Sequence, residues 1–406
     1  MKKIVVVGGG HASAQFCASI NEAAEAQDVH LTMVTEEGYL PYQRPPLSKT
    51  WMKDENPQPA WLRPASFYAD KSIDVRLDTK VTSIDATTHT LKLSSGDTLS
   101  YDTLVLATGT RARTLPLFDA GFSNAGALRT LADAQRLREQ ISAAQNVMVL
   151  GGGFIGLEIA ATSAALGKQV TVLEASDRML GRSVSSEVSD WLLQAHRAAG
   201  VTIELGARAD RLEVVDDKVT GVWVADRLYP ADVVVVGVGA EPNIEVAQAA
   251  GLECDNGIVV NEFMQTSQPD IYAIGDCTAF TSHASGRRMR LESVQNANDQ
   301  ARCAARSILG DPAPYTAMPW FWSDQWAIRI QIAGVPETHH ERFVRGDVSS
   351  GKFSVLYFDG NYLTCAESVN LPTDHMAARR LIAGKVALDR QQALDPAAAL
   401  KTLDQA

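Results

Sequence analysis

Two apolar runs in the chain are each followed by a cluster of glycines. Residues 4–7 (IVVV) and 147–150 (VMVL) lead into three glycines and then into Ala-rich segments with apolar residues at helical spacing. A short apolar run that stops at a turn is typical of a buried strand. Each unit continues into a second apolar run, at residues 30–34 and 169–173. The pattern therefore predicts two βαβ units of about thirty residues each.

Further apolar runs extend both units. Residues 99–106 (LSYDTLVL) and 229–236 (YPADVVVV) each predict one strand that ends in a glycine turn. Residues 81–93 and 210–224 place apolar stretches on either side of a polar turn, which predicts a β-hairpin in each. The two halves of this region are thus expected to share one architecture.

The pattern changes after Pro319. Residues 320–322, 328–332 and 353–358 are aromatic or β-branched, and helical spacing begins at residue 374. These residue types and spacings predict a third domain of antiparallel sheet plus helices. A length of 406 residues suits two or three domains of about 100–200 residues.

Charge and apolar length exclude some classes of protein. The net charge is −11, which argues against a nucleic-acid partner because such binding depends on clustered Lys and Arg. Five arginines form a local group in the sequence: Arg287, Arg288, Arg290, Arg302 and Arg306. This group is either a solvated charged surface or a docking surface. No stretch reaches the ~20 apolar residues of a membrane span, and the N-terminal run is too short for a signal peptide. We expect a cytoplasmic protein without a membrane partner.

The five cysteines are scattered along the chain. They are Cys17, Cys254, Cys277, Cys303 and Cys365. The number is odd and no two lie close in sequence, so neither a disulfide framework nor a metal-site spacing is visible.

The first glycine turn departs from the G-x-G-x-x-G pattern of dinucleotide-binding units. Gly8 and Gly10 occupy the first two positions, and Ser13 stands where the third glycine is expected. The first two glycines permit the bend and the approach of a pyrophosphate, whereas the third lets the helix pack closely. A serine there leaves the anion site at the helix N-terminus intact. Glu36, rather than Glu37, is predicted to bind the ribose.

The second glycine turn is complete. Gly151, Gly153 and Gly156 are followed about twenty residues later by Glu174, at the end of the next apolar run. A carboxylate there accepts hydrogen bonds from an adenosine ribose and repels a 2′-phosphate, which favours NAD over NADP. Two arginines a few residues further on weaken that preference.

Asp276 follows a short apolar strand and a glycine. Alone, this position suits a helix N-cap. Together with the strand-ending Ala-Thr-Gly at 107–109 and the N-terminal glycine turn, it also suits a residue that binds the ribityl and phosphate region of a flavin.

Several stretches together carry a family resemblance. They are residues 41–49 (PYQRPPLSK), 107–109 (ATG), 128–131 (LRTL), 151–158 (GGGFIGLE), 274–277 (IGDC), 290–297 (RLESVQNA) and 319–325 (PWFWSDQ). The chain resembles the FAD-dependent, NADH-using ferredoxin reductases of bacterial P450 and Rieske oxygenase systems, nearly end to end. The first and last of these stretches are more specific than any glycine motif.

The resemblance implies a fold and a domain order. The fold class is α/β of the glutathione-reductase type, with two Rossmann-like dinucleotide-binding domains and an α+β C-terminal domain. Residues 1–111 and 243–319 form the FAD domain, residues 112–242 the NAD domain, and residues 320–406 the C-terminal domain.

The resemblance also implies the cofactor sites. FAD would lie against Gly8, Gly10, Ala12, Ser13, Glu36, Arg44, Lys49, Val81, Ala107, Thr108, Gly109, Arg129, Gly275, Asp276, Glu292, Val294 and Trp322. NADH would lie against Gly151, Gly153, Ile155, Gly156, Glu158, Glu174 and Gly237. Lys49, Glu158 and Trp322 are the implied catalytic residues, with Lys49 beside the isoalloxazine and paired with Glu158, and Trp322 flanking the ring. Without the resemblance, Trp322 suits an ordinary core and Lys49 an ordinary surface.

The implied reaction passes a hydride from NADH to FAD and then single electrons to a [2Fe–2S] ferredoxin. Disulfide reductases of this fold carry a close cysteine pair after the first βαβ unit, where this chain has PPLS at residues 45–48. Electrons are therefore expected to leave directly from FAD, with Arg288, Arg290 and Arg306 as candidates for docking an acidic ferredoxin. Alternatives are an NADH oxidase or rubredoxin reductase of the same fold, or a flavoprotein like apoptosis-inducing factor. We expect a monomer or weak dimer.

Overall fold

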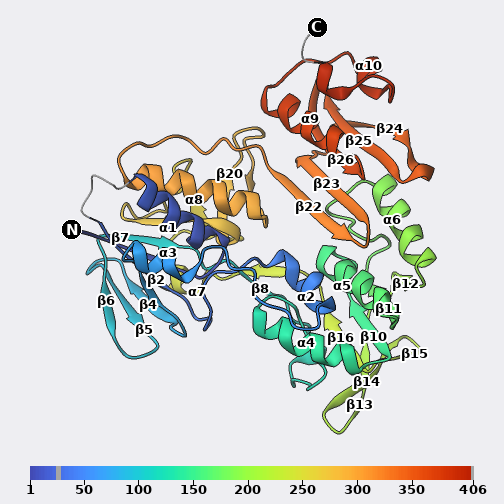
Figure 1. Cartoon of the computed structure of the whole chain (residues 1–406), viewed down its shortest axis with the longest axis horizontal. Helices are drawn as coiled ribbons and strands as arrows, with labels where there is room; N and C mark the ends of the chain where they lie inside the picture. Colours follow the sequence, from blue (N-terminus) through green and yellow to red (C-terminus); the bar gives the residue numbers. More distant parts are fainter. Residues whose placement is uncertain (24–28, 404–406) are drawn as a thin grey trace. The chain divides into compact units, whose positions relative to one another are not determined.

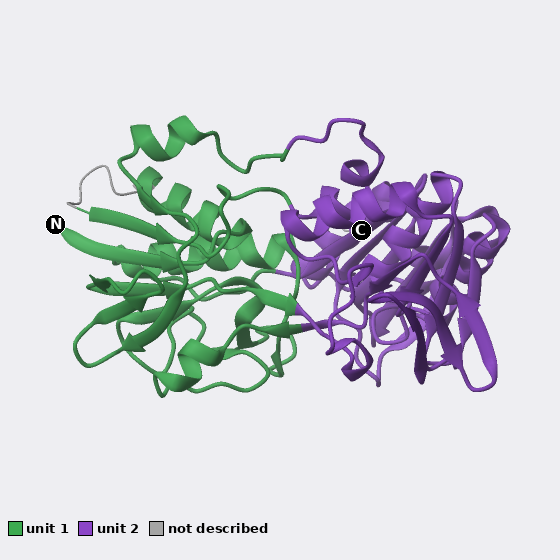
Figure 2. Cartoon of the chain, turned by 90° about the horizontal axis from the view of Figure 1, so that it is seen from below, with its two compact units in different colours: residues 1–43, 59–111, 241–317 green, residues 44–58, 112–240, 318–406 purple. Residues whose placement is uncertain are grey.

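The computed structural model describes residues 1–23 and 29–403 and divides the chain into two units (Figure 2). Unit 1, green in Figure 2, comprises residues 1–43, 59–111 and 241–317. Unit 2, purple, comprises residues 44–58, 112–240 and 318–406. Unit 2 thus contains both the predicted NAD domain and the predicted C-terminal domain, of which residues 404–406 lie outside the described part. The division into three domains stays a prediction.

Unit 1 is built on a five-stranded parallel sheet in the order β19-β7-β1-β2-β3. Its strands are β1 (Lys2–Val7), β2 (Val29–Val34), β3 (Asp74–Arg76), β7 (Thr103–Leu106) and β19 (Ile271–Ala273). The apolar run predicted at residues 4–7 is buried in β1. Helices α1 (His11–Ala23) and α8 (Val294–Ile308) pack against each other beside it (Figure 1).

Unit 2 repeats this arrangement in a second parallel sheet, in the order β12-β11-β10-β16-β9. Its strands are β9 (Ala125–Gly126), β10 (Asn146–Leu150), β11 (Gln169–Glu174), β12 (Thr202–Leu205) and β16 (Val233–Val236). The helices of this part are α4 (Leu131–Ala143), α5 (Phe154–Ala165) and α6 (Ser186–Ala198). In each sheet the chain runs outward from β1 or β10 through the next two parallel strands and then returns to the other side of that strand, at β7 or β16; in unit 2, β9 precedes β10 and lies at the edge beside β16. The point of reversal lies between β1 and β7 in unit 1 and between β10 and β16 in unit 2.

The end of the chain forms an antiparallel sheet within unit 2, in the order β22-β23-β26-β25-β24. Its strands are β22 (Trp320–Gln325), β23 (Ile328–Gly334), β24 (Glu341–Asp347), β25 (Lys352–Asp359) and β26 (Tyr362–Val369). Helix α9 (Pro372–Ala383) packs on β23 and β26 (Figure 1). The predicted antiparallel sheet plus helices is confirmed.

Both predicted hairpins are present, each in a small three-stranded sheet. The first contains β4 (Val81–Asp85), β5 (Thr90–Leu93) and β6 (Thr98–Ser100), and the second β13 (Arg211–Val215), β14 (Lys218–Val224) and β15 (Arg227–Pro230). The remaining elements are β8 (Thr110–Ala112), β17 (Ala240–Pro242), β18 (Ile258–Val260), β20 (Thr278–Thr281), β21 (Arg288–Met289), α2 (Thr50–Lys53), α3 (Ala65–Asp70), α7 (Glu245–Ala249), α10 (Arg390–Leu394), and the 3-10 turns η1 (Pro45–Ser48), η2 (Pro116–Phe118), η3 (Gly275–Cys277), η4 (Val348–Ser350) and η5 (Leu400–Thr402).

The prediction of one continuous strand at residues 99–106 and another at 229–236 was wrong. Each run divides at an aspartate into a hairpin strand and a strand of the parallel sheet. The Asp102 carboxylate accepts a hydrogen bond from the backbone N–H of Lys3 at 2.7 Å. That of Asp232 accepts from the backbone N–H of Asn146 at 2.7 Å, and this bond is the leading cause of its lowered pKa. Each aspartate thus caps the start of a neighbouring strand, which separates the two segments.

Candidate functional site

The carboxyl ends of β1 and β7 meet in unit 1 because Gly8 has no side chain. Gly8 has φ +127°, and a Cβ placed on it would lie 2.1 Å from the carbonyl oxygen of Ala107. Two residues on, a Cβ on Gly10 would meet nothing within 4 Å. The backbone is therefore closely packed at Gly8, whereas the space next to Gly10 is open. This is the reversal point of the strand order, where α/β sheets bind ligands.

A third strand end joins this edge. Gly275, directly after β19 and Ile274, has φ +82°, and a Cβ on it would lie 3.1 Å from that of Ala12. Its N–H donates to the buried side-chain oxygen of Gln300 at 2.7 Å. Asp276 comes next, inside the 3-10 turn η3, whose N-cap residue is Ile274. The alternative role of Asp276 as an N-cap is therefore wrong.

Ser13 occupies a wider place than the glycine it replaces. A Cβ on Gly156, the matching residue of the second turn, would lie 2.3 Å from the carbonyl oxygen of Gly151. Ser13 accommodates a full side chain with 0% exposure, so the space that is closed to a Cβ at Gly156 is available at this position. The Ser13 hydroxyl has no hydrogen-bond partner among the described residues.

These features fit the pyrophosphate of a dinucleotide in unit 1. The cradle at Gly8 and Gly10 opens onto the N-terminus of α1, where backbone N–H groups point outward and favour an anion. Residues Ala107 and Gly275 close its base through the contacts given above. The predicted residues Gly8, Gly10, Ala12, Ala107 and Gly275 are thus brought together at one edge.

The other predicted residues of unit 1 lie around or beyond this edge. Thr108 exchanges two hydrogen bonds with Asn243, with its hydroxyl donating at 2.6 Å, and Gly109 follows it with φ +63°. Val81 starts β4 and is buried, and Val294 starts α8. The Glu292 carboxylate accepts from Arg290 at 2.6 Å.

The two predicted ribose-binding acids, Glu36 and Glu174, do not occupy equivalent positions in the two sheets. Val7 pairs with Val34 and Leu150 pairs with Leu173, so Thr35 in unit 1 corresponds to Glu174 in unit 2. Glu36 therefore lies one residue beyond the position equivalent to Glu174. Its side chain is 63% exposed and lies 3.7 Å from Lys80.

The second glycine turn forms a matching edge in unit 2. Gly151 has φ +104°, and a Cβ on it would lie 2.4 Å from the carbonyl oxygen of Gly237. The Glu174 carboxylate accepts from the N–H of Gly152 at 2.6 Å and from the N–H of Ser176 at 2.7 Å. The Glu174 carboxylate therefore stabilises the glycine turn beside which it lies. Gly153 caps α5, whose first turn leaves the Ile155 side chain 46% exposed.

One of the two arginines after Glu174 is already engaged. The Arg178 guanidinium donates to the carbonyl oxygens of Val184 at 3.0 Å and Gly181 at 2.7 Å. It is held in its own loop, and so it offers less to a 2′-phosphate than the sequence suggested.

Glu158, on the second turn of α5, is the centre of a buried polar cluster in unit 2. The Lys49 ammonium lies 2.6 Å from one carboxylate oxygen, to which Ser48 also donates at 2.5 Å. The other oxygen accepts from the Ser323 hydroxyl at 2.7 Å. The Glu158 side chain is 4% exposed and that of Lys49 20%. Three donors thus satisfy a buried carboxylate, as such a group requires.

The segment before Lys49 is fixed by a 3-10 turn and by a hydrogen bond from α5. Pro45 and Pro46 start the 3-10 turn that ends at Ser48, and the Thr162 hydroxyl of α5 donates to the Ser48 carbonyl at 2.9 Å. Arg44 donates to the carbonyl of Arg129 at 2.7 Å, so these two predicted flavin residues lie together.

Trp322 lies on the other face of β22 from Ser323, because successive strand residues alternate between faces. Its ring centroid is 5.6 Å from that of Trp320, and the residue is partly exposed. Trp322 is thus only partly buried, and its role at the flavin stays a prediction. The structure brings Lys49 to Glu158 and places Trp322 in a separate aromatic group.

The predicted docking arginines of unit 1 are paired with carboxylates. Arg288 lies 3.4 Å from Glu253 and 3.3 Å from Asp255, and Arg306 lies 2.7 Å from Asp311. Arg290 is only 12% exposed and pairs with Glu292. These partners reduce the positive charge that the sequence alone suggested.

All five cysteines are free thiols. Burial raises the pKa of each, to about 12 for Cys17 and to about 11 for Cys303. A reactive cysteine needs the thiolate form, which these environments disfavour.

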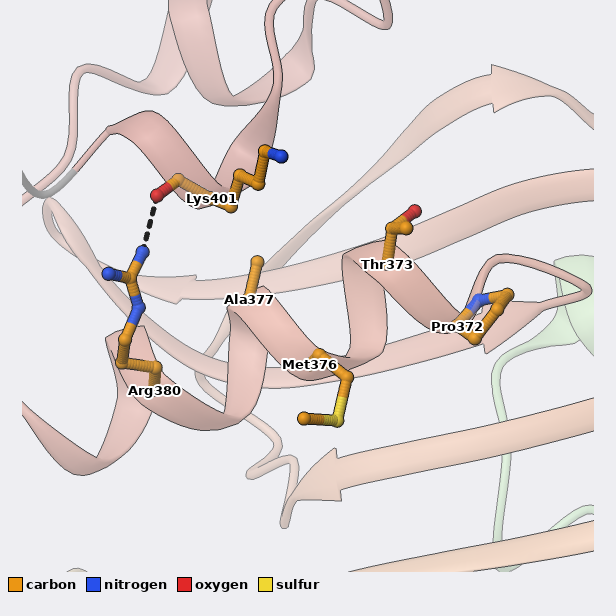
Figure 3. Close-up of a pocket in the computed structure, with 6 residues that line it drawn as sticks. All are labelled: Pro372, Thr373, Met376, Ala377, Arg380 and Lys401. Carbon is orange, nitrogen blue, oxygen red and sulfur yellow. Dashed lines mark hydrogen bonds between the residues drawn. The ribbon is translucent and has the colours of Figure 1, made fainter.

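One pocket of about 380 Å³ lies at the end of the chain in unit 2 (Figure 3). It is lined by Pro372, Thr373, Met376, Ala377, Arg380 and Lys401, none of which is a predicted site residue. In the described residues, no helix has the length and apolar character needed to cross a membrane.

Sequence reasoning missed the two serines that bind Glu158. Ser48 and Ser323 stand inside the two most specific stretches, which was the available signal. It also missed Gln325, whose amide donates to the Ser323 hydroxyl at 3.3 Å, and His196, whose ring lies 2.6 Å from the Gln325 side-chain oxygen.

Comparison with known proteins agrees with this geometry. The family model for pyridine nucleotide-disulphide oxidoreductases matches residues 2–301, and the reductase C-terminal model matches residues 320–404. Rhodocoxin reductase of Rhodococcus erythropolis is 40% identical, over 97% of this chain and 92% of its own.

Two solved structures are also similar. The ferredoxin reductase for the CYP199A2 system from Rhodopseudomonas palustris is 40% identical, with a TM-score of 0.95 over 99% of both chains. Putidaredoxin reductase, in its covalent complex with putidaredoxin, is 37% identical, with a TM-score of 0.95 over 99% of this chain and 98% of that chain. The resemblance and the fold class expected from the sequence are confirmed. The chain belongs to the pyridine nucleotide-disulphide oxidoreductase family.

Proposed function

We propose that this chain is an NADH-dependent ferredoxin reductase that supplies electrons to a P450 or Rieske oxygenase through a [2Fe–2S] ferredoxin. The observation that carries the proposal is the pair of glycine cradles at equivalent reversal points, one in each parallel sheet. A single chain with two such cradles suits an enzyme that binds FAD and NADH together. Rhodocoxin reductase and the other similar proteins are named as reductases.

In this proposal unit 1 holds FAD. The turn at Gly8 and Gly10 receives the pyrophosphate, with Ala12 and Ser13 at the start of α1. Asp276 follows Gly275 directly and lies next to that edge. When bound there, FAD would supply hydride acceptance and one-electron transfer, chemistry that the protein's own side chains lack.

Unit 2 holds NADH at the second cradle. Its pyrophosphate lies over Gly151 and Gly153, and Glu174 binds the ribose while it also holds the turn through Gly152. The exposed Ile155 side chain offers an apolar surface beside the cradle.

Glu158 and Lys49 orient the nicotinamide end of NADH. Hydride transfer depends on the placement of the donor carbon more than on an acid or base. A carboxylate fixed by three donors, next to a partly exposed ammonium, offers a rigid acceptor to the carboxamide N–H. The roles at the flavin expected for Arg44, Lys49, Arg129, Val81, Glu292, Val294 and Trp322 stay predictions.

Electrons leave this protein without a thiol relay. The five cysteines are free, and burial raises their pKa values, so none is suited to exchange a disulfide. A separate one-electron carrier is therefore the natural acceptor. Location in the cytoplasm and a monomeric or weakly dimeric state stay predictions.

Arg288 and Arg306 are proposed to contribute to docking an acidic ferredoxin, because both are exposed. Their acidic neighbours make the contribution small. We expect Arg288→Ala and Arg306→Ala each to raise KM for ferredoxin by about twofold to threefold at low ionic strength, and less in high salt. An unchanged KM at low salt would remove them from the interface.

The experiment that tests the function uses the purified full chain. We expect a yellow protein that reduces [2Fe–2S] ferredoxins from NADH faster than from NADPH, with slow transfer to oxygen or rubredoxin. A folded chain that takes up no FAD contradicts the proposal. Rapid turnover with oxygen alone supports an NADH oxidase instead.

A further inference from the structure

A chain of buried hydrogen bonds runs from helix α6 to Glu158. The Nε2 atom of His196 lies 2.6 Å from the side-chain oxygen of Gln325. The Gln325 amide donates to the Ser323 hydroxyl at 3.3 Å, and Ser323 donates to Glu158 at 2.7 Å. His196, Gln325, Ser323 and Glu158 are each 3% exposed or less. All four residues belong to unit 2.

The bonds of this chain all donate toward Glu158. Because the Gln325 oxygen is an acceptor only, His196 must carry its proton on Nε2. That contact turns the amide so that its NH₂ group meets Ser323, which leaves the serine proton for Glu158. His196 thus fixes the amide orientation, and the amide fixes the direction of the serine hydroxyl.

The packing around His196 makes this orientation specific. Ser323 and Gln325 lie on the same face of β22, two residues apart, so both reach toward α5 and α6. The His196 ring lies 4.7 Å from the Trp326 ring, at the turn between β22 and β23, where Trp326 has φ +51°. Burial also lowers the pKa of His196, which favours the neutral ring. The same α6 histidine therefore contacts the tip of the β22–β23 hairpin at Trp326 and has its tautomer fixed by Gln325.

We propose that His196 and Gln325 are positioning residues for Glu158, acting through Ser323, and that they set the affinity of the second cradle for the nicotinamide end of NAD(H). The inference rests on the proposed function in assigning Glu158 to the carboxamide. Both residues precede Ser323 in the chain of hydrogen bonds that leads to Glu158, so in this proposal neither touches the ligand. Their effect comes from holding the Ser323 hydroxyl so that one Glu158 oxygen is fixed while the other binds Lys49 and Ser48.

The test measures binding of NAD⁺ to the FAD-loaded chain by calorimetry, with no turnover. Ser323→Ala and Gln325→Met are each expected to raise Kd by about three- to tenfold, because each removes a hydrogen bond that fixes a charged group. His196→Leu is expected to do the same. His196→Gln keeps an N–H donor and should recover most of the affinity. Asp324→Asn, on the opposite face of β22, is the matched control and should leave Kd unchanged.

A double substitution separates positioning from general packing. Once Ser323→Ala has broken the chain, adding His196→Leu should raise Kd by less than twofold more, since both act through one hydroxyl. Effects that multiply, or a His196→Gln variant as weak as His196→Leu, would overturn the proposal. Thermal unfolding of each variant identifies any that fail to fold, and Gln325→Met then tests the chain from its middle.

A measurement without nucleotide keeps this result distinct from the proposed function. Nitrogen NMR of histidine-labelled protein should show His196 protonated on Nε2 in the parent. In Gln325→Met the ring-nitrogen signals of His196 should be shifted. A parent chain that shows this tautomer but binds no NAD⁺ contradicts the proposed function. A parent that binds NAD⁺ normally, with every variant matching its Kd, contradicts the positioning role alone.

Discussion

The ammonium of Lys49 lies 2.6 Å from the carboxylate of Glu158, a residue 109 positions later in the chain. The acid is buried on α5 and the base comes from the segment just before α2. This pair joins the most specific motif of the N-terminal region to the second glycine turn. Its position in one unit, next to the proposed NADH cradle, makes it the most testable contact of the site.

Removing the cation should destabilise the fold. Lys49→Met leaves the Glu158 charge buried with only two hydroxyl donors, and breaking a buried pair in this way costs up to ~3–5 kcal/mol. We expect a loss of about 1–3 kcal/mol in the free energy of unfolding, because Lys49 is partly exposed and the serines remain. Urea unfolding of the FAD-loaded chain measures it. Lys49→Met with Glu158→Gln should recover stability, and failure to do so would show that the charge is not the cause.

Methyl groups on the first glycine turn should separate folding from cofactor binding. Gly8→Ala puts a Cβ 2.1 Å from the Ala107 carbonyl at φ +127°, so we expect a loss of at least ~2 kcal/mol of stability together with loss of FAD. Gly10→Ala has open space and should fold normally while it obstructs the pyrophosphate. We therefore expect Gly10→Ala to hold less FAD at an unchanged unfolding midpoint of the apoprotein.

Flavin absorbance per chain, after gel filtration, checks both glycine variants. A Gly10→Ala protein with a full complement of FAD would show that the pyrophosphate lies elsewhere. A Gly8→Ala protein as stable as the parent would contradict the close approach of β1 and β7.

Much of the fold was predictable because its signals are local. Glycine turns and apolar runs predicted both βαβ units, because a strand buried in a parallel sheet has four or five consecutive apolar residues. The breaks at Asp102 and Asp232 were not predictable, because each aspartate caps a strand that is distant in sequence. Strand β24 was missed because it is mostly exposed, and β26 because buried polar residues, Glu367 and Ser368, interrupt its apolar pattern.

The glycine turns and Glu174 were predictable from the pattern of the βαβ units, but the Lys49–Glu158 pair only through the family's motifs. Lys49 and Glu158 were paired from the resemblance, and the structure brings them into contact. The contact of Ser323 with Glu158 spans 165 positions and depends on which face of β22 meets α5, which no local pattern states. The same holds for His196, whose helix has an ordinary amphipathic sequence. Contacts between distant elements are what sequence reasoning lacked.

Glu174 should set the preference for NADH. Glu174→Ala removes the carboxylate that repels a 2′-phosphate, and it also frees the N–H of Gly152, so we expect a drop of about tenfold or more in the ratio of kcat/KM for NADH over NADPH. Glu174→Gln keeps an acceptor for Gly152 and removes only the charge. It should lose part of the preference with less effect on stability. Both variants should retain FAD, which we propose is held in unit 1, and an unchanged ratio in both would remove Glu174 from the ribose.

Stability should fall on acidification because of a buried histidine in α9. Burial, with a further contribution from Arg379, lowers the pKa of His375 to about 4 from 6.5, and neither ring nitrogen has a partner among the described residues. The unfolded chain therefore binds a proton that the folded chain excludes between these values. The free energy of unfolding should decrease as pH falls from 6.5 toward 4, by on the order of 3 kcal/mol. Urea unfolding at several pH values measures this, and His375→Leu should flatten the curve in that window. His339→Gln, which changes an exposed ring, is the control and should keep the slope. An equally steep curve in His375→Leu would assign the acid sensitivity to other groups.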